Sequence, residues 1–222
     1  MKKIISIAIV LIFAVGLGVF LLKISPEQKP GASSADFDLN NLTKLTQPSE
    51  VTDGDHILGN PAAKNIMVAY EDFQCPACAN FRPILESFPD QLTDTKVVFR
   101  HFPLFTLHKN AIIAAYASEA AAAQNKFWEF GALLYENQPE WDSLSDPTEK
   151  FVEFAQKAGV EDLDKFKNNV VSKTFKSRVE RDVREGYGLN VSGTPTLYFN
   201  GKILQLDGLE GIRKQVEPLY VK

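Results

Sequence analysis

Hydrophobic residues are most concentrated near the N-terminus of the 222-residue chain. A run of 19 residues begins at Ile4 and ends at Leu22, carries no charge and contains 16 apolar residues. A helix of this length spans about 28 Å, close to the ~30 Å hydrocarbon core of a bilayer. Lys2 and Lys3 precede the run, so the positive-inside rule places the N-terminus in the cytoplasm. We therefore predict a membrane anchor over residues 1–24. A cleaved signal peptide is the alternative, and either one exports the rest of the chain.

The next segment has a different composition. Residues 25–41 contain Pro26, Pro30 and Gly31 together with serines and scattered charges. This composition is typical of a flexible linker. We assign residues 42–222 to a folded domain, because regular hydrophobic patterns occur within that part of the chain.

Two short apolar runs, at residues 66–70 and 96–100, predict buried strands. Between them Phe81, Ile84, Leu85 and Phe88 follow a helical spacing of three and four, and we expect this helix to end at Pro89. A helix that connects two neighbouring strands makes the strands parallel. The sequence therefore predicts a β-α-β unit.

The pattern from residue 109 to residue 190 is almost wholly helical. One helix in this block carries charged pairs such as Arg178 and Asp182, which we expect on a solvated face with weak pairing. Strands at 196–199 and 202–204 then flank Asn200-Gly201, a strong hairpin signal, and a helical stretch at 209–219 follows. This order predicts an α/β fold with a mixed sheet and a helical insertion at about 104–190.

Composition narrows the classes of function. The chain has 24 Lys and Arg against 28 Asp and Glu, a net charge of −4, and its basic residues form no block. Nucleic acid is therefore not expected as a partner, because phosphate binding needs a cationic stripe. Two cysteines are too few for a fold held together by disulfides.

The two cysteines form the motif Cys75-Pro76-Ala77-Cys78 where the first predicted strand meets its helix. Such a pair can hold a metal, form a structural crosslink or act as a redox couple. Zinc needs two further ligands, usually closely spaced, and the spacing of His56, His101 and His108 does not provide them. We expect these histidines on the surface or satisfied in the core, with no metal site.

A crosslink between these cysteines closes only four residues and constrains the unfolded chain little. The redox use is favoured instead, because Cys75 lies at a helix N-terminus. Free backbone N–H groups and the helix dipole stabilise a thiolate there. Cys78 lies one turn later and is less accessible, and Pro76 suits the first turn because its missing N–H would be unpaired anyway.

Several ordered motifs between residues 55 and 222 resemble the DsbA-like thiol:disulfide oxidoreductases of the thioredoxin superfamily. The motifs are GNPAAK at 59–64, DFQCPAC at 72–78, FRHFPL at 99–104, Phe127-Trp128 and GTPT at 193–196. The resemblance implies a thioredoxin fold with an inserted helical domain. It also implies that Cys75 attacks and forms mixed disulfides and that Cys78 is the resolving thiol.

The same resemblance assigns a role to the segment around Pro195. It implies a cis Pro195 that faces the cysteines, and a Thr194 backbone that pairs with an extended substrate as an added strand. Two features depart from the family pattern. The dipeptide Pro76-Ala77 lacks the histidine of the best-known strongly oxidising member. The position six residues before Cys75, often a buried acid, is Ala69 here. Glu71 would share its strand face and could substitute for that acid, or could be an exposed acid at the strand end.

We predict an extracytoplasmic oxidase that donates the Cys75–Cys78 disulfide to exported proteins with reduced cysteines. A membrane partner coupled to quinone would reoxidise the protein, which we expect to be a monomer without a cofactor. The dipeptide Pro76-Ala77 does not fix the redox potential, since the span from thioredoxin to DsbA is about 150 mV. A reductase or isomerase of the same fold, and a non-catalytic peptide-binding module, are the alternatives.

Overall fold

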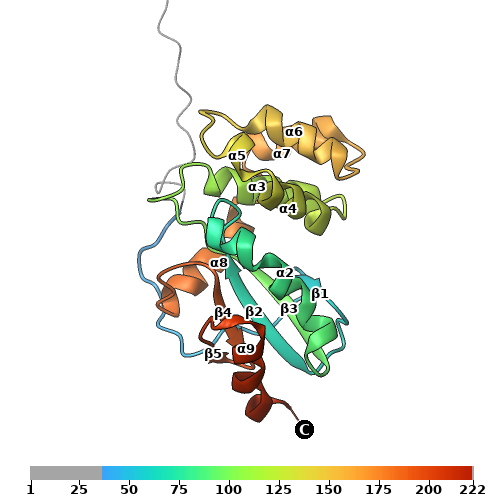
Figure 1. Cartoon of the computed structure of the whole chain (residues 1–222). Helices are drawn as coiled ribbons and strands as arrows, with labels where there is room; N and C mark the ends of the chain where they lie inside the picture. The colour runs from blue at the N-terminus through green and yellow to red at the C-terminus, as the bar shows by residue number, and fades with distance from the viewer. Residues whose placement is uncertain (1–36, 222) are drawn as a thin grey trace, which may run out of the picture. The chain divides into compact units, whose positions relative to one another are not determined.

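The computed structural model describes residues 37–221, drawn in colour in Figure 1. The predicted anchor at 1–24 and most of the predicted linker at 25–41 lie outside the described residues. Between residues 37 and 221, none of the helices has both the length and the apolar character that a membrane span requires.

Five strands form one sheet in the order β1-β3-β2-β4-β5. Strands β2 and β3 are parallel, and every other neighbouring pair is antiparallel. The sheet is therefore mixed, as predicted, although the short edge strand β1 was not foreseen. The strands are β1 (His56–Leu58), β2 (Asn65–Glu71), β3 (Thr95–His101), β4 (Thr196–Phe199) and β5 (Lys202–Ile203).

Helices cover both faces of this sheet and also form a separate group. Helices α2 and α9 pack on one face, and the segment that follows α8 packs on the other. In Figure 1, α3 to α7 gather beyond one end of the sheet. The helices are α2 (Pro76–Gln91), α3 (Ala111–Ala122), α4 (Phe127–Glu136), α5 (Gln138–Trp141), α6 (Thr148–Lys157), α7 (Leu163–Val171), α8 (Lys176–Gly188) and α9 (Gly208–Val216), followed by the 3-10 turn η2 (Glu217–Leu219).

Strand β2 shows how the pleat distributes its side chains. Met67 and Ala69 pack beneath α2 and α9, whereas Val68 and Tyr70 belong to the core on the opposite face. Successive side chains of a strand point to opposite faces. Glu71, the last residue of β2, therefore continues the row on the α2 side, which is the face that carries Cys78.

Helix α2 does not end at Pro89, as we expected, but continues to Gln91. Each of its internal prolines, Pro83 and Pro89, removes one backbone hydrogen bond. Leu85 and Phe88 are buried against the sheet, and the N–H of Leu92 still bonds to the carbonyl of Phe88 at 2.9 Å. Tertiary packing of this apolar face thus maintains the helix past the proline.

The predicted hairpin at Asn200-Gly201 is confirmed. Both residues have positive φ, 46° and 82°, which is the backbone of a two-residue turn that matches strand twist. Asn200 also ties the turn to the sheet, because its side chain accepts a 2.9 Å bond from the Ile66 N–H and donates one to the Asn65 side chain. The turn residue therefore sets the register of β4 against β2.

Helix α3 forms the centre of the helical group. It is buried along most of its length, and α4, α6, α7 and α8 all contact it. Alanine side chains permit this close approach from several directions, because they add little volume around the helix axis. The group shares one apolar core that includes Phe130, Phe151 and Phe166 and reaches both cysteines.

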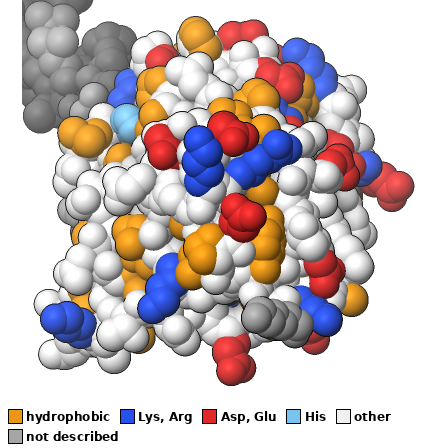
Figure 2. Space-filling view, turned by 60° about the horizontal axis from the view of Figure 1, so that its bottom comes forward, with side chains coloured by type: hydrophobic (Ala, Val, Ile, Leu, Met, Phe, Trp, Pro, Cys, Tyr) orange, Lys and Arg blue, Asp and Glu red, His pale blue; other side chains and the backbone are white. Residues whose placement is uncertain are grey.

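One surface of the protein, which Figure 2 shows, carries acidic and basic side chains intermixed, with hydrophobic side chains between them. No continuous stripe of one charge crosses this face. The picture agrees with the small net charge of −4.

Candidate active site

The cysteine motif lies where β2 leads into α2. Cys75 is the N-cap of α2, and Pro76 occupies its first position. Both thiols are free; Cys75 is 6% exposed and Cys78 is fully buried at 0%. Cys75 is therefore the more accessible sulfur, as expected from its place at the helix start.

The segment before β4 approaches the first cysteine. The Cys75 sulfur lies 3.4 Å from the backbone carbonyl oxygen of Thr194, to which the thiol donates when it is protonated. The Thr194–Pro195 peptide bond is cis, as the resemblance implied. The fold thus brings together two segments that are 119 residues apart in the sequence.

The two thiols have opposite acidities. The pKa of Cys75 is lowered to about 5, chiefly by a hydrogen bond from the Cys78 thiol, with help from Thr194 and from the backbone N–H groups of Ala77 and Cys78. Burial raises the pKa of Cys78 well above its usual value, and the neighbouring Glu71 raises it further. At neutral pH the pair therefore consists of a Cys75 thiolate and a neutral Cys78 thiol.

Glu71 is 1% exposed, so the alternative of an exposed acid at the strand end is wrong. Its Oε2 accepts a 2.9 Å hydrogen bond from the Tyr135 hydroxyl of α4. Burial raises the pKa of Glu71 to about 8, although the hydrogen bonds from Tyr135 and Cys78 favour the carboxylate. A carboxyl group with such a pKa can give or take a proton beside Cys78 near neutral pH.

Asp72 organises the turn before the cysteines and was not singled out from the sequence. Its Oδ1 accepts the Gln74 N–H at 2.8 Å, while its Oδ2 accepts the Leu104 N–H at 2.9 Å. Oδ2 also contacts Nδ1 of His108 at 2.6 Å, and this bond raises the pKa of His108. The sequence did contain a local signal, since Asp commonly accepts from the N–H two residues later.

Two glutamines connect the motif to the helical insertion, and sequence reasoning missed both. The side-chain amide of Gln138, in α5, donates to the carbonyls of Phe73 and Cys75 at 2.8 and 3.0 Å. The side chain of Gln74 accepts from the Asn110 N–H at 2.7 Å and donates to the Asp142 carbonyl at 2.9 Å. The insertion therefore fixes the backbone on both sides of Cys75.

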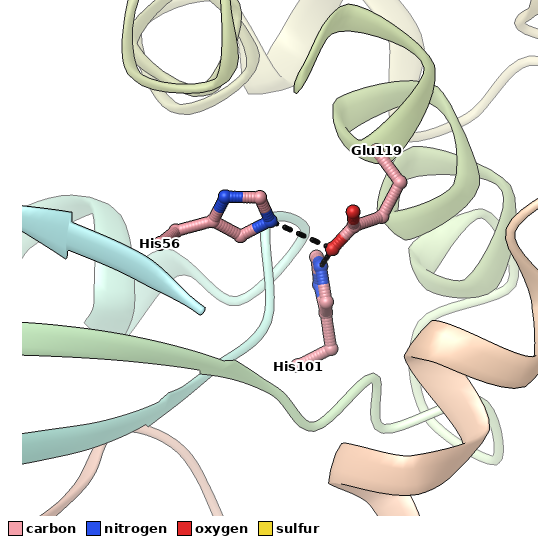
Figure 3. A group of neighbouring side chains, drawn as sticks. All are labelled: His56, His101 and Glu119. Carbon is pink, nitrogen blue, oxygen red and sulfur yellow. Dashed lines mark hydrogen bonds and ion pairs between the residues drawn. The ribbon is translucent and has the colours of Figure 1, made fainter. Parts of the chain in front are cut away.

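His56 and His101 lie in a different cluster, around Glu119 of α3, which Figure 3 shows. Each histidine has its Nε2 atom 2.8 Å from Oε1 of Glu119. His101 is fully buried and His56 partly so, in keeping with the expectation of hydrogen-bonded histidines. No motif in the sequence predicts that Glu119 is their shared partner or that the two rings converge.

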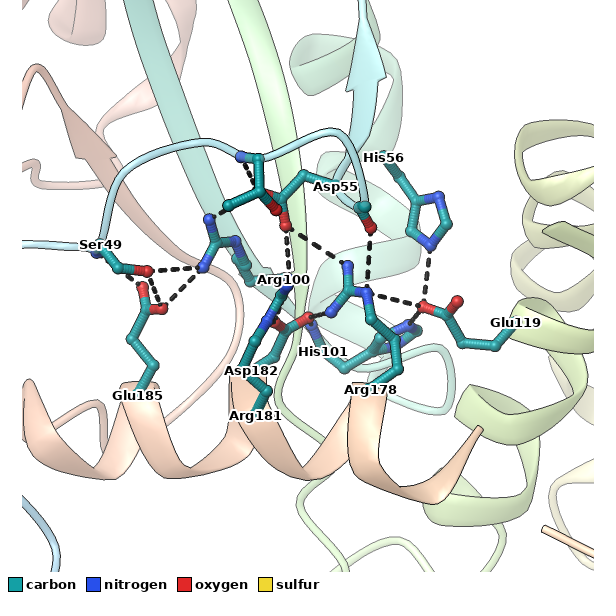
Figure 4. Close-up of polar contacts among 12 residues, drawn as sticks. Ser49, Asp55, His56, Arg100, His101, Glu119, Arg178, Arg181, Asp182 and Glu185 are labelled. Atoms are coloured by element: carbon teal, nitrogen blue, oxygen red, sulfur yellow. Dashed lines mark hydrogen bonds and ion pairs between the residues drawn. The ribbon is translucent and has the colours of Figure 1, made fainter. Parts of the chain in front are cut away.

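A network of buried charges continues from this cluster, as Figure 4 shows. Asp182 is 0% exposed and pairs with Arg178 at 2.5 Å, so the expected solvated face with weak pairing is wrong for this pair. Arg100 of β3 lies beside α8 and pairs with Asp55 at 2.9 Å and with Glu185 at 2.6 Å. Asp182 and Glu185 of α8 face β3 rather than solvent: Asp182 accepts a hydrogen bond from the His101 N–H, and Glu185 pairs with Arg100.

Comparison with known proteins places this geometry in a family. The sequence model of the thioredoxin family matches residues 51–218. The oxidised structure of BdbD from Bacillus subtilis superposes with a TM-score of 0.67 and 28% identity, over 81% of this chain and 98% of that one. Wolbachia pipientis α-DsbA1 has the same fold, with a TM-score of 0.61 and 21% identity over 77% and 92% of the two chains.

Curated relatives match only over part of their length. A protein of Salinispora tropica named Na(+)/H(+) antiporter NhaA 3 is 35% identical over 150 residues, which are 68% of this chain and 22% of that protein. NhaA 1 of Mycolicibacterium gilvum is 33% identical over 202 residues, 88% of this chain and 30% of that protein. The chain thus spans less than a third of either relative. From the family match, the chain belongs to the thioredoxin family, and its fold resembles that of the DsbA-like thiol:disulfide oxidoreductases.

Proposed function

We propose that the protein is an extracytoplasmic oxidase that donates the Cys75–Cys78 disulfide to exported proteins with reduced cysteines. The observation that carries this proposal is the opposite acidity of the two thiols. The pKa of Cys75 is about 5, whereas burial raises that of Cys78 well above its usual range. A stable Cys75 thiolate favours the reduced protein, and a couple whose reduced form is stabilised is oxidising.

The first step of the proposed reaction forms a mixed disulfide. A substrate thiolate attacks Sγ of Cys75, a substrate–Cys75 bond forms, and the Cys75–Cys78 bond breaks. The electron pair goes to Cys78, which takes a proton as it leaves. Protonated Glu71, whose pKa burial raises to about 8, is the neighbouring acid that supplies this proton.

The second step releases the product. A second substrate thiolate attacks the substrate sulfur of the mixed disulfide, and Cys75 leaves as a thiolate. The substrate is oxidised to its disulfide, and the protein keeps both electrons as the Cys75 thiolate and the Cys78 thiol. A leaving thiol of low pKa departs faster, so the acidity of Cys75 favours release of the oxidised substrate.

In this proposal Pro195 and Thr194 form the substrate-binding edge beside Cys75. The 3.4 Å approach of the Cys75 sulfur to the Thr194 carbonyl supports this role, because a chain that pairs with this backbone brings its own cysteine near the reactive sulfur. An extended peptide bound as an added strand is held mainly by main-chain hydrogen bonds. Pro76 and Ala77 support the site by starting the helix that stabilises the thiolate.

The N-terminal sequence supports the proposed compartment. Lysines precede the uncharged run from Ile4 to Leu22, an arrangement that supports a single-pass anchor with the catalytic domain outside the cytoplasm. Electrons collected from substrates must leave the protein, and a membrane partner coupled to quinone would accept them. We propose that the protein works as a monomer, without a cofactor and without nucleic acid.

Equilibration in glutathione buffers tests the proposal by measuring the redox potential of the cysteine pair. An oxidase is expected between about −180 mV, the value of protein disulfide isomerase, and about −120 mV, the value of DsbA. A potential near thioredoxin's ~−270 mV would refute the oxidase and favour a reductase. In parallel, Cys78→Ser should accumulate mixed disulfides through Cys75. Cys75→Ser is the matched control, and a peptide-binding module would trap none with either variant.

A further inference from the structure

Two imidazoles and one carboxylate converge away from the cysteines. His56 comes from β1, His101 from β3 and Glu119 from α3, and Figure 3 shows all three side chains pointing toward one another. The two Nε2 atoms each lie 2.8 Å from the same carboxylate oxygen. One ligand atom from each residue lies within 4.8 Å of the other two. Three donor atoms this close together can share one metal ion.

We propose that His56, His101 and Glu119 bind a divalent transition metal of the Zn²⁺ type, with water as the fourth ligand. Two histidines and one glutamate are a known zinc donor set, with bonds of about 2.0–2.2 Å. Ligand atoms at tetrahedral positions around such an ion are about 3.3 Å apart. The two Nε2–Oε1 contacts of 2.8 Å therefore have to widen by about half an ångström, and the two Nε2 atoms, which lie within 4.8 Å of each other, have to settle at a similar spacing.

The aromatic neighbours hold both imidazoles in this orientation. The ring of His56 is stacked on Phe127, with ring centroids 3.5 Å apart and planes 11° apart. The ring of His101 is packed edge-on against Phe99 at 5.1 Å and 73°. Side chains whose rotation is blocked lose little entropy when they bind an ion, and an apolar shell around a metal site is common.

The protonation states also suit a metal. Burial lowers the pKa of His101, so its ring is neutral at pH 7. The hydrogen bonds from His101 and His56 outweigh burial at Glu119 and lower its pKa, which keeps it a carboxylate. Neutral imidazole and ionised carboxylate are the forms that bind metal.

The charged groups that face the site are of both signs. Arg178 of α8 has its Nε atom 3.7 Å from Glu119 Oε1. Its guanidinium is paired with Asp182 at 2.5 Å and lies 3.5 Å from Asp55, and both acids also pair with Arg181. Figure 4 shows this acid–arginine network continuing from the histidine cluster.

A solvent-open pocket gives access to the cluster. His56 and Glu119 line it, together with Asp53, Asn125 and Trp128. A metal ion and its water ligand can enter from this pocket. Because the three donors come from two strands and from the central helix of the insertion, the bound ion would fasten the insertion to the sheet. Its effect is expected on stability, independently of the cysteines.

Calorimetric titration of ZnCl₂ into the oxidised, tag-free protein tests the proposal. The Cys75–Cys78 disulfide removes the two thiols as competing ligands. We expect one Zn²⁺ per chain and a melting temperature that rises with zinc. His56→Gln and Glu119→Gln, which retain hydrogen-bonding groups, should each weaken binding at least tenfold and abolish the rise. His108→Gln is the matched histidine control and should bind like the unaltered protein.

Three results would overturn the proposal. They are the absence of stoichiometric binding, unchanged affinity in His56→Gln, and binding of Ca²⁺ with no binding of Zn²⁺. Melting of each variant without metal establishes that it is folded. Co²⁺ added to the unaltered protein gives a readout that needs no variant, because imidazole and carboxylate ligands produce visible absorption bands. A spectrum like that of aqueous Co²⁺ would count equally against the site.

Discussion

The acidity of Cys75 makes the stability of the reduced protein depend on pH in a calculable way. Folding lowers its pKa from an ordinary value of 9.0 to about 5. A group whose pKa falls on folding contributes stability above its folded pKa and loses it as pH falls through that value. The oxidised protein has no such thiolate. The difference in unfolding free energy between the two forms should therefore grow with pH.

The expected magnitude follows from linkage. The thiolate stabilises the reduced form by about 2.7 kcal/mol at pH 7 and by about 0.4 kcal/mol at pH 5. Closing a four-residue loop favours the oxidised form by about 1.9 kcal/mol at any pH on the chain-entropy model. The unfolding free energy of the reduced form should thus exceed that of the oxidised form by about 1 kcal/mol at pH 7. At pH 5 it should be lower than that of the oxidised form by about 1.5 kcal/mol.

Urea unfolding of both redox forms at pH 5 and pH 7, followed by the fluorescence of Trp128 and Trp141, measures this difference. Groups that titrate alike in the two forms cancel. Cys75→Ser provides the control, since it has neither disulfide nor thiolate and should change with pH as the oxidised protein does. The assigned acidity would be refuted if the difference in unfolding free energy between the two forms stayed constant between pH 5 and pH 7. It would also be refuted if the oxidised form gained stability relative to the reduced form at pH 7.

Three further substitutions probe the site and the core. Glu71→Gln removes the acid that protonates the leaving Cys78, so formation of the mixed disulfide from the oxidised protein, measured by rapid quench, should slow by about 100-fold or more. Burial raises the pKa of Glu71 to about 8, so the unaltered protein loses stability as pH rises and Glu71 ionises. The stability of Glu71→Gln relative to the unaltered protein should therefore be greater at pH 8 than at pH 5. His108→Ala removes a cationic neighbour and should raise the pKa of Cys75, followed by thiolate absorbance. Trp141→Phe loses volume at a fully buried position and a 2.9 Å hydrogen bond, which should cost about 1–3 kcal/mol in urea unfolding.

The sheet was largely predictable, because its central strands carry short-range signals. The apolar runs at 66–70 and 96–100 lie inside β2 and β3, and the Asn200-Gly201 turn specifies its own backbone. Strand β1 was missed because three residues at a sheet edge are too few to establish an alternating pattern. The continuation of α2 past Pro89 was missed because it depends on packing that local propensity does not contain.

The site residues were predictable only where they belong to a short sequence motif. The cysteines and Pro195 belong to short motifs, whereas the Glu71–Tyr135 bond joins residues 64 positions apart. No local pattern reports such a contact. Arg178 and Asp182 are four positions apart whether their helix face is solvated or buried, so their spacing could not decide between these environments. The packing of the insertion determines both the Glu71–Tyr135 contact and the burial of the Arg178–Asp182 pair.

The helical insertion is therefore part of the proposed redox site and not only a cover for the sheet. It supplies Tyr135 to Glu71, Gln138 to the carbonyls beside Cys75, and His108 to Asp72. Each contact acts on a residue that adjoins one of the two thiols or influences its pKa. A change in the packing of α4 or α5 should consequently alter the acidity of the cysteines without touching the motif itself. Members of this fold with the same two residues between their cysteines can then differ in potential, because the insertion sets part of the environment that determines it.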